Sequence, residues 1–377
     1  MMGGVILSGT GVFTPPDVVT NEMLVDSYNE HTENWNKEHA AAIEAGELVK
    51  RELSTTAFIE KASGIKARYM MEGRGPTEPG RMYPYLSKMA PETNMGTPAQ
   101  VKMAYEAAMG ALEEAGLTGA DIDMVIISAS VWERFVPSMA TELQQMLGAK
   151  GFAFDMSMAC SSATFGMSTA TDAIKSGMAN KALVVTAEYL TPLMNYEERD
   201  GHFIFGDAAV AMVLEREGET ASTTAFRINS RQLKTEFSTN IQAGFGSRVL
   251  IEREKIGDPS QRFVQHGRTV FRELLPMVID LVREHLDEIG KTVEDFKRFW
   301  LHQANINMNV FATKKLLGRD PNQEDAPIIL DEFANTAGAG CMLAFHMHKA
   351  DFARGDLGMI CSFGASYSIG CFVVERL

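Results

Sequence analysis

The sequence has few cysteines, no block of basic residues and no long apolar run. Its 377 residues include four cysteines, none in a Cys-x-x-Cys pair, so a disulfide framework is excluded and reduced thiols are expected. The formal net charge is −14, which argues against nucleic acid or an anionic membrane as the main partner. No apolar run approaches the roughly 20 residues of a membrane span, and the N-terminus lacks the features of a secretory signal. We therefore expect a cytoplasmic protein without a membrane span.

The order of the sequence patterns predicts an α/β fold. Hydrophobic residues make up 45% of the chain, enough for two domains or two closely packed halves. The segment "VILSGTGVF" predicts a buried N-terminal strand, and from Pro98 onward helix, glycine turn and strand alternate, which is typical of sheets covered by helices. Residues 21–97 combine polar helical patches with a stretch rich in Gly, Pro and Arg. We predict a cap insert there.

An internal repeat divides the chain. Residues 111–128 ("ALEEAGLTGADIDMVIIS") match residues 285–302 ("HLDEIGKTVEDFKRFWLH") without a gap at an offset of 174. "ACSSA" at Cys160 falls on "ANTAG" at Asn335 at an offset of 175. A nearly constant offset indicates a duplicated unit, so we predict halves at residues 1–218 and 219–377. Cys160 and Asn335 would then occupy equivalent loop-to-helix corners, near the strand end that carries His302.

Cys160 is the candidate nucleophile. Small residues surround it, and the helical spacing that follows ends at Gly177, which predicts a thiol at a helix N-terminus. A helix N-terminus favours an anion by up to about 2 kcal/mol, which would lower the thiol pKa from about 8.5 to about 7. The alternative is that Cys160 is a small buried apolar residue, and this segment alone leaves both open.

His302 and Asn335 are modest signals taken singly. "RFWLHQANINMN" places His302 at the end of an apolar strand, where parallel α/β sheets present site residues, although a structural histidine is the commoner case. "FANTAGAG" places Asn335 before a helix start, where a simple N-cap is the alternative. Their combination with the repeat favours a shared site.

Several segments together resemble a known family. They are "DMSMACSSATFG", "IFGDAAVAMVLE", "WLHQANINMN", "FANTAGAG" and "CSFGASYSIGCFVVER". In order and spacing they resemble the β-ketoacyl-acyl-carrier-protein synthase III family of the thiolase superfold. The resemblance runs from about Pro98 onward and includes the N-terminal strand and "FIEKASGIKAR". It implies a thiolase-like duplicated αβαβα fold with two pseudo-symmetric halves. The long insert resembles a branch of the family that uses longer acyl primers.

The resemblance implies an acyltransferase of fatty acid biosynthesis that catalyses a decarboxylative Claisen condensation. Cys160 would take an acyl group from acyl-CoA, and malonyl on an acyl carrier protein would bind next. His302 and Asn335 would donate hydrogen bonds to the developing enolate, and the backbone N–H groups of Cys160 and Ala365 would form the oxyanion hole. Both acyl-CoA and malonyl-carrier protein are substrates, so no cofactor and no metal are expected. A homodimer is implied.

The sequence departs from the family pattern at the substrate contacts. Where short-chain members carry a Trp and an Arg beside the CoA adenine, this chain has Phe58 and Ala62, and Asn307 replaces the Arg five residues after the histidine. Candidate replacements for these contacts are Lys61, Lys66 and Arg68.

The acyl pocket is predicted to be long. Where a Phe from the neighbouring subunit caps the pocket in short-chain members, Val136 aligns, and one inserted residue also allows Phe135. A smaller cap opens a longer tunnel, so the predicted primer is medium-chain, of roughly octanoyl size.

Four alternatives stay open. The order Cys, His, Asn also fits a papain-type peptidase, but its sequence context is missing. A thiolase would need a second cysteine, for which Cys361 is the candidate. A head-to-head acyl-condensing enzyme would need a carboxylate base, for which Glu133 is the candidate. A non-catalytic partner subunit would be expected to lose Cys160, which this chain keeps.

Overall fold

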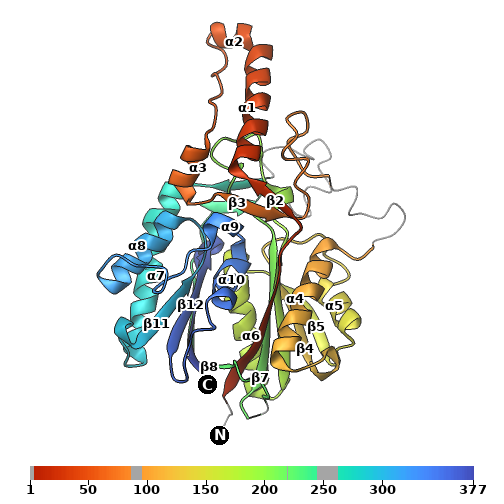
Figure 1. Cartoon of the computed structure of the whole chain (residues 1–377), viewed down its shortest axis with the longest axis vertical. Coiled ribbons are helices and arrows are strands. Elements are labelled where there is room, and N and C mark those ends of the chain that lie inside the picture. Colours follow the sequence, from red (N-terminus) through yellow and green to blue (C-terminus); the bar gives the residue numbers. More distant parts are fainter. Residues whose placement is uncertain (1–3, 86–95, 219, 244–261) are drawn as a thin grey trace.

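Nine strands form one continuous mixed sheet through the molecule (Figure 1). The computed structural model describes residues 4–85, 96–218, 220–243 and 262–377. In spatial order the strands are β11 (Phe296–Leu301), β12 (Leu357–Gly364), β13 (Ser368–Arg376), β8 (Phe226–Thr235), β1 (Val5–Phe13), β7 (Ala208–Arg216), β6 (Lys181–Glu188), β4 (Met124–Ser128) and β5 (Phe152–Met156). β1 pairs with β7 along most of its length but joins β8 through only two residue pairs. The sheet therefore has two parts that meet at β1.

The two parts of the sheet repeat one topology. In the first, β4 and β6 are parallel, and β6, β7 and β1 follow antiparallel. In the second, β11 and β12 are parallel, and β12, β13 and β8 follow antiparallel. The predicted duplicated α/β fold is confirmed. The division at residues 218 and 219 falls between β7 and β8, and as a domain boundary it stays a prediction.

The repeat at an offset of 174 residues is visible as local structure. Thr118 and Asp121 form a capping box around the short helix η2 (Gly119–Asp121), and Thr292 and Asp295 form the same box around η8 (Val293–Asp295). β4 and β11 follow these boxes. A capping box satisfies backbone N–H groups at a helix start, so the same four-residue signal begins the same strand in both halves.

The helices complete an αβαβα arrangement (Figure 1). α6 (Ser162–Ser176) and α10 (Gly340–Met347) lie in the centre, and α6 contacts β4 and β6 of the first half and β12 and β13 of the second. α4 (Ala99–Ala115) and α5 (Met139–Leu147) cover the outer face of the first half, and α7 (Gly267–Glu288) and α8 (Ile306–Leu317) cover that of the second. Because the sheets are covered on both faces, strands such as β4 are buried at every residue.

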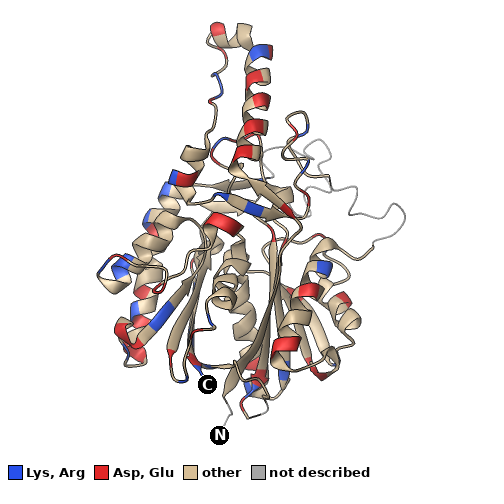
Figure 2. Cartoon of the chain, viewed as in Figure 1, with Lys and Arg blue, Asp and Glu red and all other residues tan. Residues whose placement is uncertain are grey.

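The predicted cap insert adds a projecting arm above the layers (Figure 1). It contains α1 (Asn21–Glu38), α2 (Ala40–Glu44), α3 (Thr56–Ser63) and β3 (Ala67–Met70), which pairs with β2 (Asp17–Thr20). Its residues 86–95 lie outside the described part of the chain. Thr20 caps α1. Glu22, Asp26, Glu30 and Glu33 are exposed and lie three or four residues apart, which puts them on one side of α1. Figure 2 shows acidic residues along this helix, which suits contact with water rather than with an acidic partner.

Three smaller elements lie close to the centre of the molecule. β9 (Ile241–Ala243) pairs with β10 (Phe263–Gln265), and α9 (Leu330–Phe333) precedes the segment that carries Asn335.

Among the described helices, none combines the length and the apolar character needed to cross a bilayer.

Candidate active site

Cys160 lies in a tight corner between β5 and α6. The short helix η3 (Ala159–Ser161) carries it directly into α6, and Ala159 has φ +45°. The predicted position at a helix N-terminus is confirmed. A left-handed alanine is strained, and such strain concentrates at functional sites. The thiol is half-buried and faces a cavity.

The expected acidification of Cys160 is wrong. Burial first, and then the charge of Glu188, raise the pKa of the thiol from its usual 9.0 to about 12. This rise corresponds to roughly 4 kcal/mol, more than the about 2 kcal/mol that a helix N-terminus can supply. The thiol is therefore protonated at pH 7 and would have to lose its proton to act as a nucleophile.

His302 follows β11 directly and is almost fully buried. Its backbone N–H donates to the Cys361 carbonyl at 2.8 Å, and its ring meets the edge of Phe363 at 5.4 Å between centroids. Burial lowers the pKa of the imidazole to about 4, so His302 is neutral at pH 7. Its Nδ1 has no hydrogen-bond partner among the described residues. A neutral imidazole can donate one hydrogen bond without carrying a charge.

The neighbours of His302 in the "HQAN" segment are structural. Gln303 accepts from Ile329 N–H and donates to the carbonyls of Leu301 and Pro327. The Asn305 side chain accepts from Met308 N–H and caps α8. These bonds fix the strand end that presents His302.

Asn335 lies in an irregular loop between α9 and α10. Its backbone bonds to the Ile204 carbonyl and to Gly206 N–H, at 3.0 and 3.1 Å. Its side-chain Oδ1 accepts from Ala337 N–H at 2.9 Å, which leaves Nδ2 as the donor of this amide. Asn335 is therefore not the N-cap of α10, which begins at Gly340.

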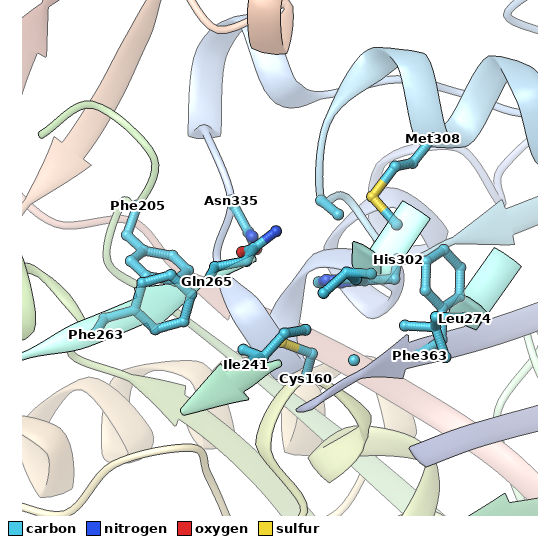
Figure 3. Close-up of a pocket in the computed structure, with 13 residues that line it drawn as sticks. Cys160, Phe205, Ile241, Phe263, Gln265, Leu274, His302, Met308, Asn335 and Phe363 are labelled. Atoms are coloured by element: carbon cyan, nitrogen blue, oxygen red, sulfur yellow. The ribbon is translucent and has the colours of Figure 1, made fainter. Parts of the chain in front are cut away.

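The structure brings Cys160, His302 and Asn335 around one cavity (Figure 3). Phe205 and Phe263 border it on one side, and Met308, Leu274 and Phe363 on the other (Figure 3). A second cavity of about 370 Å³ also opens at Cys160. Its lining is mostly apolar and includes Val131, Leu190, Leu193, Phe205, Phe237, Ile241 and Phe263. One thiol is thus shared by a space with polar donors and a space suited to an apolar chain.

Two backbone N–H groups face the Cys160 sulfur. They belong to Cys160 itself and to Ala365, and both favour the thiolate, although burial outweighs them. Ala365 follows Gly364 at the end of β12, and a Cβ built on Gly364 would lie 2.4 Å from Cys160 Cβ and 2.8 Å from its Sγ. The next residue, Ser366, has φ +59°. The C-terminal loop is therefore packed directly against Cys160.

The predicted pairing of corners needs correction. η3 and α6 correspond in structure to η9 (Ala337–Ala339) and α10 at an offset of 178, and Ala337 has φ +42°, close to that of Ala159. The counterpart of Cys160 is therefore Gly338, and Asn335 lies three residues before it. The sequence offset of 175 was wrong because the loop before α10 differs in length from the loop before α6.

The predicted substrate contacts are only partly accessible. Phe58 is half-buried, and the Arg199 guanidinium lies 4.1 Å above its ring. Asn307 is exposed and donates to the Ala62 carbonyl at 3.1 Å. Arg68 is buried and donates to Val19, Asn21 and Phe203. Its proposed contact with CoA is therefore wrong, whereas Lys61 and Lys66 are exposed.

The segment before Pro137 is exposed in the single chain. Phe135 is 63% and Val136 78% exposed, large fractions for apolar side chains. Glu133, the candidate base of the head-to-head alternative, accepts from Gln100 N–H at 2.6 Å at the start of α4. This carboxylate is thus engaged in capping a helix.

Comparison with known proteins identifies the family of this chain. The sequence models of 3-oxoacyl-[acyl-carrier-protein] synthase III and of its C-terminal part match residues 154–232 and 286–376. The chain is 45% identical over 352 residues to the β-ketodecanoyl-[acyl-carrier-protein] synthase of Pseudomonas aeruginosa, covering 93% of this chain and 100% of that protein. The chain belongs to the β-ketoacyl-acyl-carrier-protein synthase III family.

Other relatives agree with this membership in the synthase III family. A β-ketoacyl-[acyl-carrier-protein] synthase III of Chelativorans sp. is 32% identical over 280 residues, covering 71% of this chain and 82% of that protein. The crystal structure of a 3-oxoacyl-[acyl-carrier-protein] synthase III from Aquifex aeolicus superposes with a TM-score of 0.74 at 25% identity, covering 99% and 100% of the two chains. The predicted family, thiolase-like fold and acyltransferase class are confirmed.

Sequence patterns did not predict the roles of two further side chains, Arg199 and Glu188. Arg199 lies far in sequence from Phe58, and only the fold places them together. Glu188 ends the apolar segment "ALVVTAE", and a carboxylate at the end of a buried strand was an available signal. Cys361, considered as a second reactive thiol, is fully buried, 2.8 Å from the sulfur of Cys371.

Proposed function

We propose that the chain condenses a medium-chain acyl group with malonyl-acyl-carrier protein through an acyl group bound to Cys160. The Cys160 thiol attacks the carbonyl carbon of acyl-CoA, the bond from that carbon to the CoA sulfur breaks, and CoA leaves as its free thiol with the proton that Cys160 gives up. After malonyl binds, His302 and Asn335 donate to its thioester oxygen while CO2 leaves, and the resulting carbanion attacks the acyl-Cys160 carbonyl. The bond to sulfur then breaks, and the Cys160 thiolate takes up one proton from the solvent, which regenerates the thiol.

One observation carries this proposal: a single thiol lies between two polar side-chain donors and two backbone N–H groups. The backbone pair suits the tetrahedral oxyanion formed at Cys160. The side-chain pair suits the enolate, because prearranged neutral donors in a water-poor cavity stabilise charge as it develops. His302 is neutral at pH 7, since its pKa is about 4.

The apolar cavity supports a primer longer than acetyl. Its volume of about 370 Å³ lies within the range of small-molecule pockets, about 300–1,000 Å³. The name of the Pseudomonas relative indicates a ten-carbon product, and an eight-carbon primer gives such a product after the addition of two carbons. Octanoyl-CoA is therefore the proposed primer.

The proposal predicts which acyl group loads onto the enzyme. In a competition between equal amounts of acetyl-, butyryl-, octanoyl- and dodecanoyl-CoA, intact-mass spectrometry should show mainly an octanoyl adduct. Cys160→Ala should form no adduct, because the other three cysteines are buried. An acetyl adduct in excess over octanoyl would overturn the primer assignment, and an adduct on the Cys160→Ala variant would overturn the nucleophile.

The Phe58 and Arg199 pair is proposed to hold the adenine of CoA. A guanidinium stacked over an aromatic ring presents flat faces that suit a planar base. Arg199→Ala should raise the KM for acyl-CoA about tenfold, which corresponds to about 1.4 kcal/mol, and should leave kcat nearly unchanged. Arg272→Ala, on an exposed side chain of α7, is the control. A KM that stays within twofold of wild type would place the nucleotide elsewhere.

Phe135 and Val136 are proposed to cap the acyl cavity of a second copy in a homodimer. Two adjacent exposed apolar side chains are typical of an interface. Light scattering of the full chain should give twice the monomer mass, and Val136→Glu should lower it. A wild-type monomer would contradict this proposal.

A further inference from the structure

Glu188 is a buried carboxylate beside the active site. It is the last residue of β6 and is fully buried. Its oxygens accept from the Ser130 backbone N–H, from the Ser130 hydroxyl at 2.8 Å and from Gly338 N–H at 3.1 Å. Ser130 and Ala337 both line the apolar cavity at Cys160. Glu188 therefore connects two segments of the cavity wall by hydrogen bonds, although it does not line the cavity itself.

The duplicated fold explains this position. β6 and β12 each have eight residues and occupy equivalent places in the two halves, so Glu188 corresponds to Gly364. Gly364 lies against Cys160, and Glu188 lies against Gly338, the counterpart of Cys160, whose built Cβ would be 2.8 Å from the Glu188 carboxylate. At the second corner, the carboxylate of Glu188 thus fills the space that the thiol side chain fills at the first.

The same comparison applies to the backbone donors. The N–H of Cys160 faces the sulfur, and its counterpart, the N–H of Gly338, donates to Glu188. The loop that carries Asn335 is therefore held at Gly338, three residues after Asn335, by a hydrogen bond to the Glu188 carboxylate. Because hydrogen bonds to a charged acceptor are the stronger ones, the ionised carboxylate fixes the loop more firmly than a neutral amide would.

We propose that Glu188 is a positioning residue: it holds the Asn335 loop against the Cys160 corner through Gly338 and Ser130, and its carboxylate, when charged, slows reaction of the thiol. The role for Asn335 rests on the proposed function. The effect of the Glu188 charge on the thiol does not rest on the proposed function, because it is a property of the free enzyme.

The charge effect has a defined pH range. Burial raises the pKa of Glu188 to about 7, and the charge of Asp207 contributes to this rise. Glu188 lies close to the Cys160 corner, because a Cβ built on Gly338 would be 2.8 Å from its carboxylate and 3.1 Å from the carbonyl of Ala159, the residue before Cys160. At this position its charge raises the pKa of Cys160. The carboxylate is therefore mostly neutral below pH 6 and charged above pH 8, so its effect on the thiol should develop across that interval.

The test compares Glu188→Gln with wild type by the rate at which iodoacetamide alkylates Cys160, followed by intact mass between pH 5.5 and 9. The two rates should agree at pH 5.5, and the variant should react about tenfold faster at pH 9, where wild type carries the charge. Glu215→Gln is the matched control. It changes another buried carboxylate, at the far end of the same strand pair, and should leave the profile unchanged. Superimposable profiles for Glu188→Gln and wild type would overturn the charge effect.

Condensation tests the positioning role. Glu188→Gln should lower kcat at least tenfold with the KM for acyl-CoA within twofold of wild type, because the primer is bound by other groups. Glu188→Asp keeps the charge but shortens the side chain. Iodoacetamide should therefore alkylate Cys160 of this variant at the wild-type rate, whereas condensation should still be slow. Normal condensation by both variants would overturn the positioning role. A wild-type enzyme that forms no acyl adduct would instead overturn the proposed function and leave the alkylation result standing.

Discussion

The His302→Ala variant should load an acyl group onto Cys160 at nearly the wild-type rate and condense it about 10²–10³-fold more slowly. The imidazole is neutral and buried beside Asn335, so its removal takes away one donor to the enolate. Loss of one such donor typically costs about 2.7–4 kcal/mol. The loading step is expected to survive because its oxyanion is held by the backbone of Cys160 and Ala365.

Two rates measured on one preparation test this separation. Adduct formation from octanoyl-CoA reports loading, and release of CO2 from malonyl-carrier protein reports the second step. Asn335→Ala should behave in the same way. His39→Ala, on the projecting arm and stacked on Trp35, should change neither rate. If His302→Ala lost both steps equally, the imidazole would act in loading as well.

Gly364→Ala is expected to slow acylation of Cys160 about 10²-fold while the chain still folds. Gly364 is extended, with φ 172°, so alanine is compatible with the backbone. The added Cβ, however, would lie 2.4 Å from Cys160 Cβ, and one of the two must move. A displacement of about 1 Å in a reacting group can cost about 10²-fold in rate.

The adduct yield after octanoyl-CoA treatment and the melting temperature measure this effect together. Gly80→Ala is the control, since a Cβ there meets no atom within 4 Å, and both of its readouts should match wild type. Wild-type loading by Gly364→Ala would mean that the C-terminal loop is not pressed against the nucleophile. Loss of the melting transition would assign Gly364 to folding alone.

The sequence predicted the parts of this molecule that depend on local patterns. The alternation of helix and strand, the repeat at 174 residues and the segments around Cys160, His302 and Asn335 all correspond to observed structure. A capping box or a strand followed by a histidine is encoded within a few neighbouring residues. Such signals can be recognised without knowledge of the rest of the chain.

The errors concern properties set by distant segments. The pKa of Cys160 depends on burial and on Glu188 from another strand, which the sequence around the cysteine does not report. Arg68 is charged, yet it is buried and donates to Val19, Asn21 and Phe203, which all lie far from it in the chain. The stacking of Arg199 on Phe58 joins helix α3 to a loop between β6 and β7, and α4, α5 and α6 separate the two in the chain. Cytoplasmic location stays a prediction.

A single-turnover experiment tests the central claim most directly. Enzyme carrying octanoyl on Cys160 is freed of excess acyl-CoA and mixed with malonyl-acyl-carrier protein, and both proteins are followed by intact mass. The account predicts that the octanoyl adduct disappears while one equivalent of 3-oxodecanoyl-carrier protein forms. An adduct that persists, leaves as free octanoate or is consumed only by a second molecule of acyl-CoA would contradict it.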